Sequence, residues 1–387
     1  MQYLAIMQDI LDNGNLKHTR AGDTLSLFGK SMEFDLKEGL PLLTTKKVFY
    51  KGAVHELLWF LKGDTNIRYL VDNNVHIWDD DAYRWFKTID FKSYKVKDKD
   101  CIDGFYKLDR CVFELDELDY SLVIVGNGNE EMTMYGSVEH LSKETFIDCV
   151  KNGYKVKRKF IFNGRTIKEN IIYTFGDLGP VYGRQWRGFG AKEIDQIKSI
   201  IETLKERPDD RRMLCVAFNP DVLDEVALPP CHMMFQFYTR ELTTQERFTW
   251  LQENSDGKYD EWKAPTSETL DRLTVPKREL SISYSMRSND WCLGQPLNTF
   301  EYAVLCHIIA NICNMTVGKL IYFGGDVHIY TNQIEGCKEQ LSRIGYDKLP
   351  KLTMKRKFEN IDDVHFNDFE IVGYESEPPI KFPLSVG

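Results

Sequence analysis

The chain has 387 residues and a mass of 45.2 kDa, which allows one enlarged domain or two to three smaller ones. Its 42% hydrophobic, 13% aromatic and 28% charged residues are typical of a folded soluble protein and exclude a mainly disordered, collagen-like or membrane chain. The formal net charge of -9 argues against a global electrostatic grip on nucleic acid, so we expect no DNA binding and only small anionic ligands.

The predicted elements begin with an amphipathic helix over the first 14 residues, because Asp9 and Asp12 interrupt an apolar stretch that would otherwise resemble a signal peptide. No apolar run approaches the roughly 20 residues that span a bilayer. The nine cysteines are odd in number and form no C-x-x-C pair, which predicts neither a disulfide framework nor a four-thiolate zinc site. We therefore expect a cytoplasmic protein without a membrane partner, in the host cytoplasm if it is viral.

Helix-like and strand-like patterns then alternate to about residue 85. Val54, Leu57, Leu58 and Leu61 recur at i, i+3, i+4 and i+7, which predicts a helix with a buried apolar face. Glu56 lies within this stretch, where a carboxylate is costly unless it has a partner or a task. It could otherwise turn to solvent.

Two segments interrupt the pattern. The first, 86–174, contains short β-branched and aromatic runs such as 121–125, with a hairpin turn expected at 126–128, and predicts an inserted small α+β subdomain. The second, 241–278, is polar and predicts a loop-rich surface excursion.

Two further strands carry charged side chains. Apolar and polar residues alternate from 280 to 287, which puts Arg287 on the polar face of a half-buried strand. The apolar run 213–218 follows Arg211 and Arg212 and predicts a buried strand whose entry carries two guanidinium groups.

The strongest local feature is the run ALPPCH at 227–232, which precedes an apolar strand-like segment. Two prolines constrain the backbone before Cys231, and its thiolate would be a strong nucleophile if a cationic group such as arginine stood beside it. Residue type alone also allows a small buried cysteine without a function.

No metal site is predicted. The His-Glu pair at 55–56 would need a second histidine where Trp59 stands, and the Pro-Cys pair at 230–231 would need a second cysteine where Met234 stands.

Several motifs in register resemble the thymidylate synthase family. They are HELLWFLKGDTN at 55–66, GDLGPVYGRQW at 176–186, PDDRR at 208–212, LPPCH at 228–232, RSNDWCLGQPLN at 287–298 and GGDVHIY at 324–330. The resemblance covers about 1–85, 176–238 and 280 to the end, so both interrupting segments lie outside it.

The resemblance implies an α+β fold, a mixed sheet with flanking helices, packed as a homodimer whose active sites are shared across the interface. On that basis 1–85 and 175–387 form the catalytic domain, 86–174 an inserted subdomain and 241–278 a second insertion. The implied reaction transfers a one-carbon unit from methylenetetrahydrofolate, the co-substrate, to carbon 5 of dUMP through a covalent cysteine adduct, without a metal.

The site residues follow from their places in these motifs. Cys231 is the implied nucleophile, because carbon 5 of uracil becomes nucleophilic only after a thiolate adds to carbon 6. Glu56 is implied to transfer protons through ordered water and Tyr182 to assist proton removal from carbon 5. The implied nucleotide-binding residues are Arg20, Arg287, Ser288, Asn298, His328 and Tyr330, with Arg211 and Arg212 contributed across the dimer. Taken singly, such arginines and polar residues could also be surface charges or satisfied groups at strand ends.

Folate recognition is implied for a second set. Asp290 resembles the aspartate that contacts the pterin, whose amino and ring nitrogen donors match a carboxylate. The other implied folate-binding residues are Ile77, Trp78, Leu293 and Gly294.

Asn298 bears on the choice of base. Its amide can complement uracil by donating and accepting, whereas relatives that act on cytosine carry a carboxylate at this position. Because it precedes an apolar helical pattern, it could also cap a helix.

Two departures from the family pattern bear on the product. Met286-Arg287-Ser288 replaces the usual Gln-Arg-Ser and resembles the phage pyrimidine-nucleotide hydroxymethylases, and Gly387 follows the apolar residue expected at the C-terminus. On the run 286–290 and the two insertions, we favour a dUMP hydroxymethylase, in which water adds to the exocyclic methylene, over a thymidylate synthase, in which tetrahydrofolate delivers hydride. The alternative from another class is an inactive nucleotide- or RNA-binding relative. The presence of all four implied catalytic residues argues against it: Cys231, Glu56, Tyr182 and Asp290.

Overall fold

The structure is a computed structural model that describes residues 2–89, 101–102, 105–108, 111–114, 119–125, 131–132, 141–162, 165–259, 263 and 265–384. The chain divides into two compact units. The first comprises Met1–Asp64, Tyr182–Leu223 and Pro229–Gly387, and the second comprises Thr65–Val181 and Asp224–Leu228.

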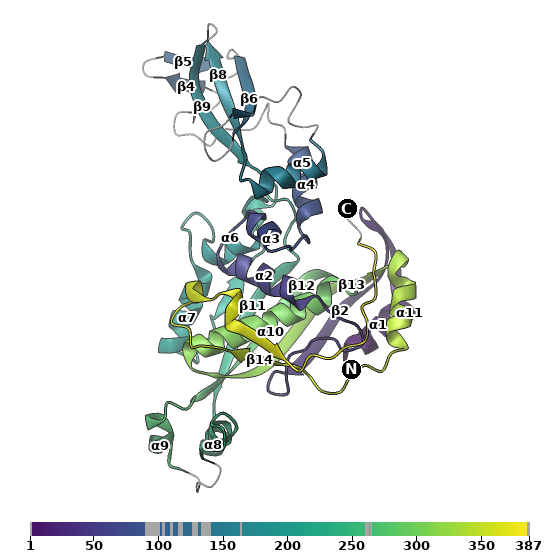
Figure 1. The fold of residues 1–387 in the computed structure, drawn as a ribbon, viewed down its shortest axis with the longest axis vertical. Helices are drawn as coiled ribbons and strands as arrows, with labels where there is room; N and C mark the ends of the chain where they lie inside the picture. Colours follow the sequence, from purple (N-terminus) through teal and green to yellow (C-terminus); the bar gives the residue numbers. More distant parts are fainter. Residues whose placement is uncertain are drawn as a thin grey trace. The chain divides into compact units, whose positions relative to one another are not determined.

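A six-stranded mixed sheet forms the centre of the first unit (Figure 1). Its strands in spatial order are β1 (Asn15–Thr19), β2 (Gly22–Asp35), β13 (Thr316–Tyr330), β12 (Arg278–Asp290), β11 (His232–Glu241) and β10 (Leu214–Val216). Only β12 and β13 of this sheet pair in parallel, and the other neighbours are antiparallel. The predicted α+β class with a mixed sheet is confirmed.

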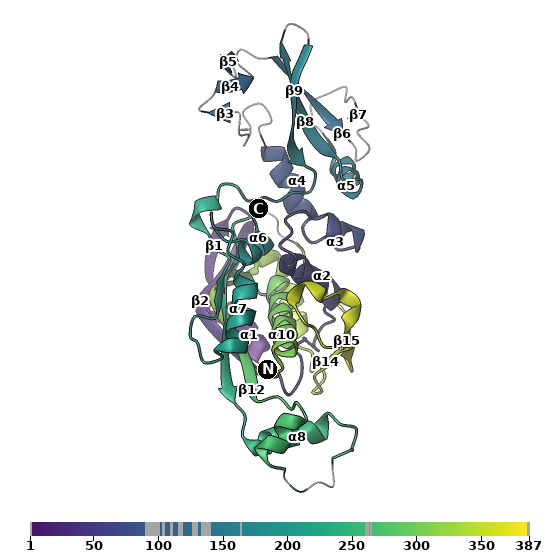
Figure 2. The same cartoon turned by 90° about the vertical axis from the view of Figure 1, so that its left-hand side faces the viewer.

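Helices cover one face of this sheet. They are α1 (Gln2–Asn13), α2 (Tyr50–Leu61), α6 (Tyr182–Arg187), α7 (Gln196–Glu206), α10 (Gly294–Cys313) and α11 (Ile334–Leu341). The longest of these, α10, is apolar nearly all round, as a buried helix must be, and it packs against β12, β13 and α2. Figure 2 shows α7 beside it. The predicted helix around Val54 is α2, and ten of its residues are buried.

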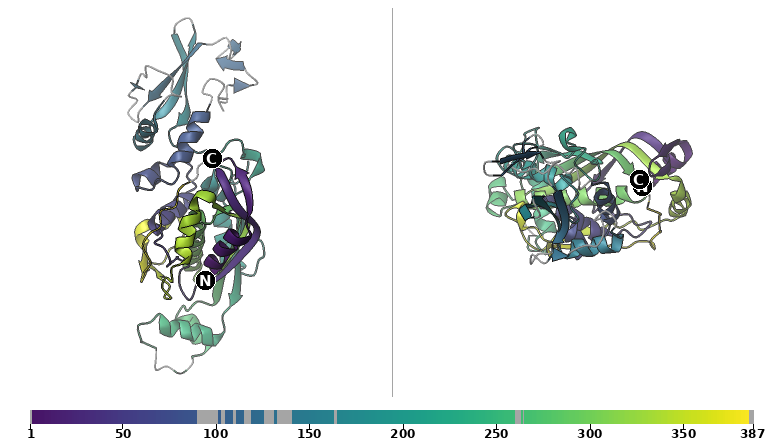
Figure 3. Two further views of the ribbon diagram at one scale, coloured as in Figure 1. Left: turned by 90° about the vertical axis from the view of Figure 1, so that its right-hand side faces the viewer. Right: turned by 90° about the horizontal axis from the view of Figure 1, so that it is seen from above.

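The predicted alternation along β12 is also confirmed. Leu280, Ile282, Tyr284 and Met286 point into the core, and Arg287 is exposed. The β1–β2 hairpin forms one edge of the sheet (Figure 3), and β10 forms the other. The predicted strand at 213–218 is thus an edge strand, with only Leu214–Val216 in the ladder.

The range 241–278 contains two helices, α8 (Thr244–Glu253) and α9 (Ser267–Arg272), where the sequence predicted a loop-rich excursion. A capping box between Thr243 and Glu246 starts α8. A small apolar cluster holds the two helices, consisting of Phe248, Leu251, Tyr259, Leu270 and Val275. The capping box and this separate small core stabilise the two helices, which the polar composition of the segment did not predict.

Short elements complete the first unit. They are the 3-10 turns Pro220–Val222, Thr331–Gln333, η5 (Ile361–Asp363) and Phe366–Asp368, and the two-stranded sheet of β14 (Lys351–Met354) and β15 (Phe369–Val372).

The second unit contains the predicted 86–174 segment. Its helices are α3 (Arg68–Asp72), α4 (Asp79–Thr88) and α5 (Lys143–Lys151), and its strands are β3 (Cys101–Ile102), β4 (Phe105–Leu108), β5 (Cys111–Glu114), β6 (Asp119–Val125), β7 (Glu131–Met132), β8 (Lys155–Phe162) and β9 (Arg165–Thr174). The strands form one sheet in the order β3-β4-β5 and another in the order β7-β6-β8-β9. The predicted strand at 121–125 is confirmed within β6, whereas the expected turn at 126–128 lies outside the described residues. The proposed boundaries of the insertion stay a prediction.

Within the described ranges, no helix has the length and apolar character needed to cross a bilayer.

Candidate active site

Cys231 stands directly before β11, at the end of the loop that contains Pro229 and Pro230. Its backbone N–H donates to the Tyr182 hydroxyl over 2.9 Å, and its carbonyl accepts the Arg287 N–H, also over 2.9 Å. The thiol is partly buried and is not part of a disulfide. The backbone of the predicted nucleophile is therefore fixed from two sides.

Arg287 brings a positive charge to the same loop. Its Nε donates to the Pro230 carbonyl and its Nη2 to the Pro229 carbonyl, each over 2.8 Å. Because a guanidinium has five N–H donors, this side chain can bind the loop and still offer donors to an anion. The predicted pairing of a cation with Cys231 is consistent with this geometry.

Tyr182, at the start of α6, is buried beside Cys231. Burial raises its pKa well above the usual value for tyrosine, and the charges of Cys231 and Glu56 act in the same direction. The hydroxyl therefore stays protonated, so Tyr182 can act as a hydrogen-bond donor or proton relay and not as a phenolate.

Glu56 is buried on α2, as its place in an apolar stretch predicted. It lies one helical turn before Phe60, whose ring centroid is 5.0 Å from that of Tyr182. Its carboxyl group interacts with Tyr182 and with Glu301 of α10. Sequence reasoning missed Glu301, although a glutamate within the apolar run of α10 was a visible signal of the same kind.

His232 and Tyr302 hold Asn298 through a chain of hydrogen bonds. The Asn298 amide nitrogen is 3.0 Å from His232 Nε2, and His232 Nδ1 is 3.0 Å from the Tyr302 hydroxyl. Burial lowers the pKa of His232 to about 3, so the ring is neutral. If Nε2 accepts from the amide, Nδ1 donates to Tyr302, and the Asn298 carbonyl oxygen can accept from a ligand. Sequence reasoning also missed His232, which directly follows the predicted nucleophile.

The possible capping role of Asn298 is corrected by the structure. The helix begins earlier, at Gly294, so Asn298 lies inside α10. The turn directly before α10 is held by Asp290, whose Oδ1 accepts the N–H of Cys292 over 2.8 Å and the N–H of Leu293 over 3.1 Å. Asp290 is thereby held rigidly at the end of β12, with Leu293 and Gly294 beside it.

The parallel pairing of β12 and β13 brings the other polar candidates to the same end of the sheet. Ser288 pairs with Asp326, and Asp290 pairs with His328. His328 Nδ1 is 3.2 Å from Asp326 Oδ1, and its ring meets the edge of Tyr330 with centroids 5.4 Å apart. Burial and the charges of Asp290 and Cys231 raise the pKa of Tyr330.

A single chain does not bring Arg211 and Arg212 to this place. The Met213 carbonyl accepts the N–H of Phe237, which lies six residues beyond Cys231 along β11, roughly 20 Å away. Arg212 is exposed and pairs with Asp210 over 2.8 Å. Arg20 is exposed in the turn between β1 and β2.

Ile77 and Trp78 belong to the second unit, immediately before α4. Ile77 is 40% exposed, whereas Trp78 is buried.

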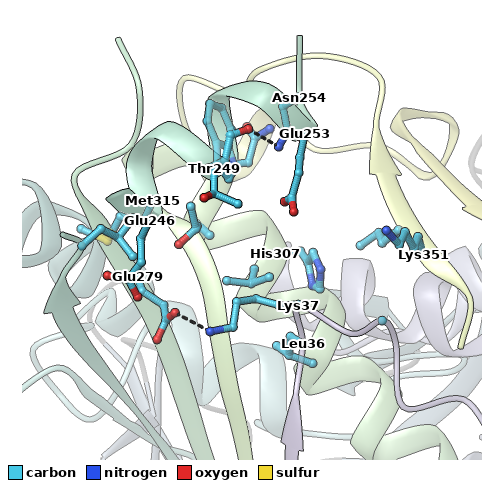
Figure 4. A pocket seen from close by; sticks show the side chains of 18 of the residues that line it. Leu36, Lys37, Glu246, Thr249, Glu253, Asn254, Glu279, His307, Met315 and Lys351 are labelled. Atoms are coloured by element: carbon cyan, nitrogen blue, oxygen red, sulfur yellow. Dashed lines mark hydrogen bonds and ion pairs between the residues drawn. The ribbon is translucent and has the colours of Figure 1, made fainter. Parts of the chain in front are cut away.

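A separate hollow of about 900 Å³ lies at the opposite end of β12 (Figure 4). Its lining includes Lys37, Glu246, Glu279, His307 and Lys351. Glu279 and Arg287 are eight residues apart along one strand, roughly 26 Å, so this hollow is not part of the cysteine site.

Among the residues that the structure describes, no group of three or more histidine, cysteine, aspartate or glutamate side chains is arranged to hold a metal ion.

Comparisons with known proteins agree with this constellation. The family model described as Thymidylate synthase matches residues 1–386. A protein of Mycoplasma mobile named thymidylate synthase is 36% identical over 386 residues, which cover 100% of this chain and 99% of the relative. Proteins of the same name from Listeria monocytogenes serotype 4b (strain F2365) and Listeria innocua serovar 6a are each 35% identical over 391 residues, with the same coverage of both chains. The family match and these alignments run through 86–174 and 241–278, which corrects the expectation that both segments lie outside the resemblance.

Proposed function

The chain belongs to the thymidylate synthase family and is a one-carbon transferase, and from this premise we propose that it converts dUMP to dTMP with release of dihydrofolate. The family transfers a one-carbon unit to dUMP with methylenetetrahydrofolate as co-substrate. The choice of product goes beyond family membership.

In the proposed reaction the Cys231 thiolate adds to carbon 6 of the uracil ring, and the resulting enolate attacks the methylene carbon of the folate from carbon 5. Removal of the proton on carbon 5 and loss of tetrahydrofolate leave an exocyclic methylene. Hydride transfer from tetrahydrofolate then gives the methyl group and dihydrofolate, and Cys231 departs as carbon 6 returns to its unsaturated state. The protonated Tyr182 and buried Glu56 are positioned to support the proton transfers.

The nucleotide contacts follow from the same geometry. Arg287 offers remaining N–H donors to the phosphate, and Asn298, oriented by His232, would complement the uracil imide. Ser288, His328 and Tyr330 are proposed to contact the nucleotide from the ends of β12 and β13. The assignments of Arg20 to phosphate and of Ile77, Trp78, Leu293 and Gly294 to folate stay predictions.

One observation carries the choice of dTMP. The side-chain amide of Gln333 donates to the Pro383 carbonyl over 3.0 Å and lies 3.4 Å from Asp290 Oδ2. This amide joins the C-terminal segment to the carboxylate proposed to bind the pterin. A segment anchored there would exclude water from the exocyclic methylene, and exclusion of water favours hydride transfer.

Met286 supports a second candidate, the dUMP hydroxymethylase. Its side chain is buried on β12, where it pairs with His232 on β11. A thioether cannot donate a hydrogen bond, unlike the amide usual in the family, so ordered water near the base would be held differently. If that water reaches the methylene, the product is 5-hydroxymethyl-dUMP and tetrahydrofolate is unchanged.

We also propose a homodimer with shared sites. Tyr238 is 67% exposed and Phe323 is 49% exposed, and they project from the sheet face that the helices leave uncovered. Aromatic side chains gathered on such a face favour burial against a second copy. Arg211 and Arg212 lie beside the middle of β11, so a dimer through this face could carry them to the other copy's cysteine.

The deciding experiment is an incubation with dUMP and methylenetetrahydrofolate, in which the nucleotide is identified by mass and dihydrofolate by absorbance. Equal amounts of dTMP and dihydrofolate are expected. A hydroxymethyl nucleotide without dihydrofolate would support the second candidate and refute the first, and turnover of dCMP would refute the assignment of Asn298. Binding of dUMP without any turnover would instead indicate the inactive relative.

A further inference from the structure

Glu301 is a buried carboxyl group that the reaction above does not use. It lies in the middle of α10 and is only 3% exposed. Neither of its carboxyl oxygens accepts a hydrogen bond of ordinary geometry from any residue that the structure describes. An ionised carboxylate in such surroundings is strongly disfavoured, so this side chain needs a proton or a partner.

The strongest polar neighbour of Glu301 is the carboxyl group of Glu56, which reaches it from the adjacent helix α2. The Asn298 amide, one turn earlier on α10, is a weaker neighbour. Two carboxylates can form a hydrogen bond only when one of them carries a proton. If Glu301 and Glu56 share one proton, Glu301 needs no N–H or O–H donor from another residue. The lack of an ordinary hydrogen bond from such a donor among the described residues agrees with a shared proton.

Among the described residues, none of the groups that shift the pKa of Glu301 carries a positive charge. Tyr284 of β12 and Tyr302 of α10 both interact with it, and burial raises the pKa of each phenol, so both remain neutral. The buried faces of α7 and η5, which also contact α10, are apolar, with Ile197, Ile200, Ile201, Leu204 and Ile361.

Glu301 is the more deeply buried carboxyl group of the two, at 3% exposed against 9% for Glu56, and burial and the charge of Glu56 both raise the pKa of Glu301, which favours the proton on Glu301. We propose that Glu301 is a positioning residue that carries a proton at neutral pH and donates it as a hydrogen bond to the Glu56 carboxylate. This inference rests on the proposed function, because Glu56 is its target. The hydrogen bond would fix the rotation of the Glu56 carboxyl group and favour its ionised form, in which it can accept protons.

Two substitutions of Glu301 distinguish hydrogen-bond donation to Glu56 from a role in filling the core. Glu301→Gln keeps an N–H donor of similar size but cannot ionise, so the plateau kcat should stay within about twofold of wild type and the acidic limb of the pH profile should stay in place. Glu301→Met keeps the volume without a donor. Its acidic limb should move upward by about one pH unit, because ionised Glu56 loses its donor, and its plateau kcat should fall roughly tenfold.

Glu279→Gln provides the matched control. Glu279 is also buried, but it pairs with Arg240 and Lys37 at the far end of β12. Its replacement should leave the pH profile of kcat unchanged, even if the melting temperature falls. An unchanged profile in Glu301→Met, or the same loss in Glu301→Gln as in Glu301→Met, would overturn the proposal.

The proton on Glu301 can also be detected without catalysis. Such a measurement tests the proposal even if a variant folds poorly or if the proposed reaction is wrong. Infrared spectra of wild-type protein with ¹³C-labelled glutamate carboxyl groups should show a protonated carboxyl band at pH 7 that Glu301→Gln removes. Absence of that band in the wild type would overturn the proposal whatever the enzyme makes. Presence of the band in a protein that yields neither nucleotide product would instead refute the proposed function and leave the shared proton established.

Discussion

Phe382 holds the C-terminal segment in place, and its removal should change the ratio of dTMP to 5-hydroxymethyl-dUMP. The Phe382 ring is 7% exposed, and Lys46 Nζ stands 4.4 Å from its centroid. The ring also packs so closely on α11 that a Cβ at Gly336 would lie 2.6 Å from it. Burial of a phenylalanine side chain contributes about 2 kcal/mol, so Phe382→Ala should weaken closure of the segment roughly thirtyfold.

If the closed segment protects the exocyclic methylene from water, Phe382→Ala should change the product more than the early steps. Release of tritium from [5-³H]dUMP reports proton removal, and dihydrofolate reports hydride transfer. We expect the ratio of dihydrofolate to tritium release to fall while 5-hydroxymethyl-dUMP appears. Ile344→Ala, at an apolar residue that is 93% exposed, is the control and should not change the ratio. An unchanged ratio in Phe382→Ala would refute the link between closure and hydride transfer.

Three further predictions follow from the site. Arg287→Lys cannot reproduce the fork that joins two proline carbonyls, so dUMP affinity measured by calorimetry should fall about tenfold or more, whereas Lys37→Arg should leave it unchanged. The pKa of His232 is about 3 in the folded protein and 6.5 in the unfolded chain, so the unfolded chain binds more protons between these values. The free energy of unfolding should therefore fall as pH drops below about 6.5, and His232→Gln should reduce that slope in urea titrations; an equal slope in both proteins would contradict the buried neutral ring. Random mixing of Cys231→Ala and Arg212→Ala subunits should restore roughly a quarter of wild-type activity, because half the dimers would hold one intact site of two, and no restoration would refute site sharing.

The sequence predicted those helices and strands whose apolar residues repeat with a clear helical or strand period. The spacing around Val54 gave α2, and the alternation from 280 to 287 gave β12 with Arg287 outward. In β12 the apolar side chains face one core, so the period of the sequence reports the buried face directly, whereas α2 is buried nearly all round and its period indicated only the helix. The motifs likewise predicted that Cys231, Tyr182 and Glu56 meet, and the structure brings them together.

The missed features depend on contacts between distant parts of the chain. Glu301 and Glu56 are brought together by the packing of α10 on α2, which no local period reports. The start of α10 was misjudged because the turn before it, at Cys292 and Leu293, is held by Asp290 from the end of a strand, and the helix itself begins without a side-chain cap. In 241–278 the capping box of α8 was readable, but the small separate core that stabilises both helices was not.

Asp290 illustrates how one side chain can make the site and the fold depend on each other. Its Oδ1 accepts the N–H groups of Cys292 and Leu293, which lie directly before α10, so rotation of the carboxylate would leave both donors without this partner. Oδ2 faces Gln333, which also binds the C-terminal segment. A pterin that approached Oδ2 would meet an acceptor of fixed direction next to the segment that must close over it. If Asp290 binds the pterin as proposed, its rigid placement would reduce the ordering that folate binding requires and would couple that binding to closure through the Gln333 amide.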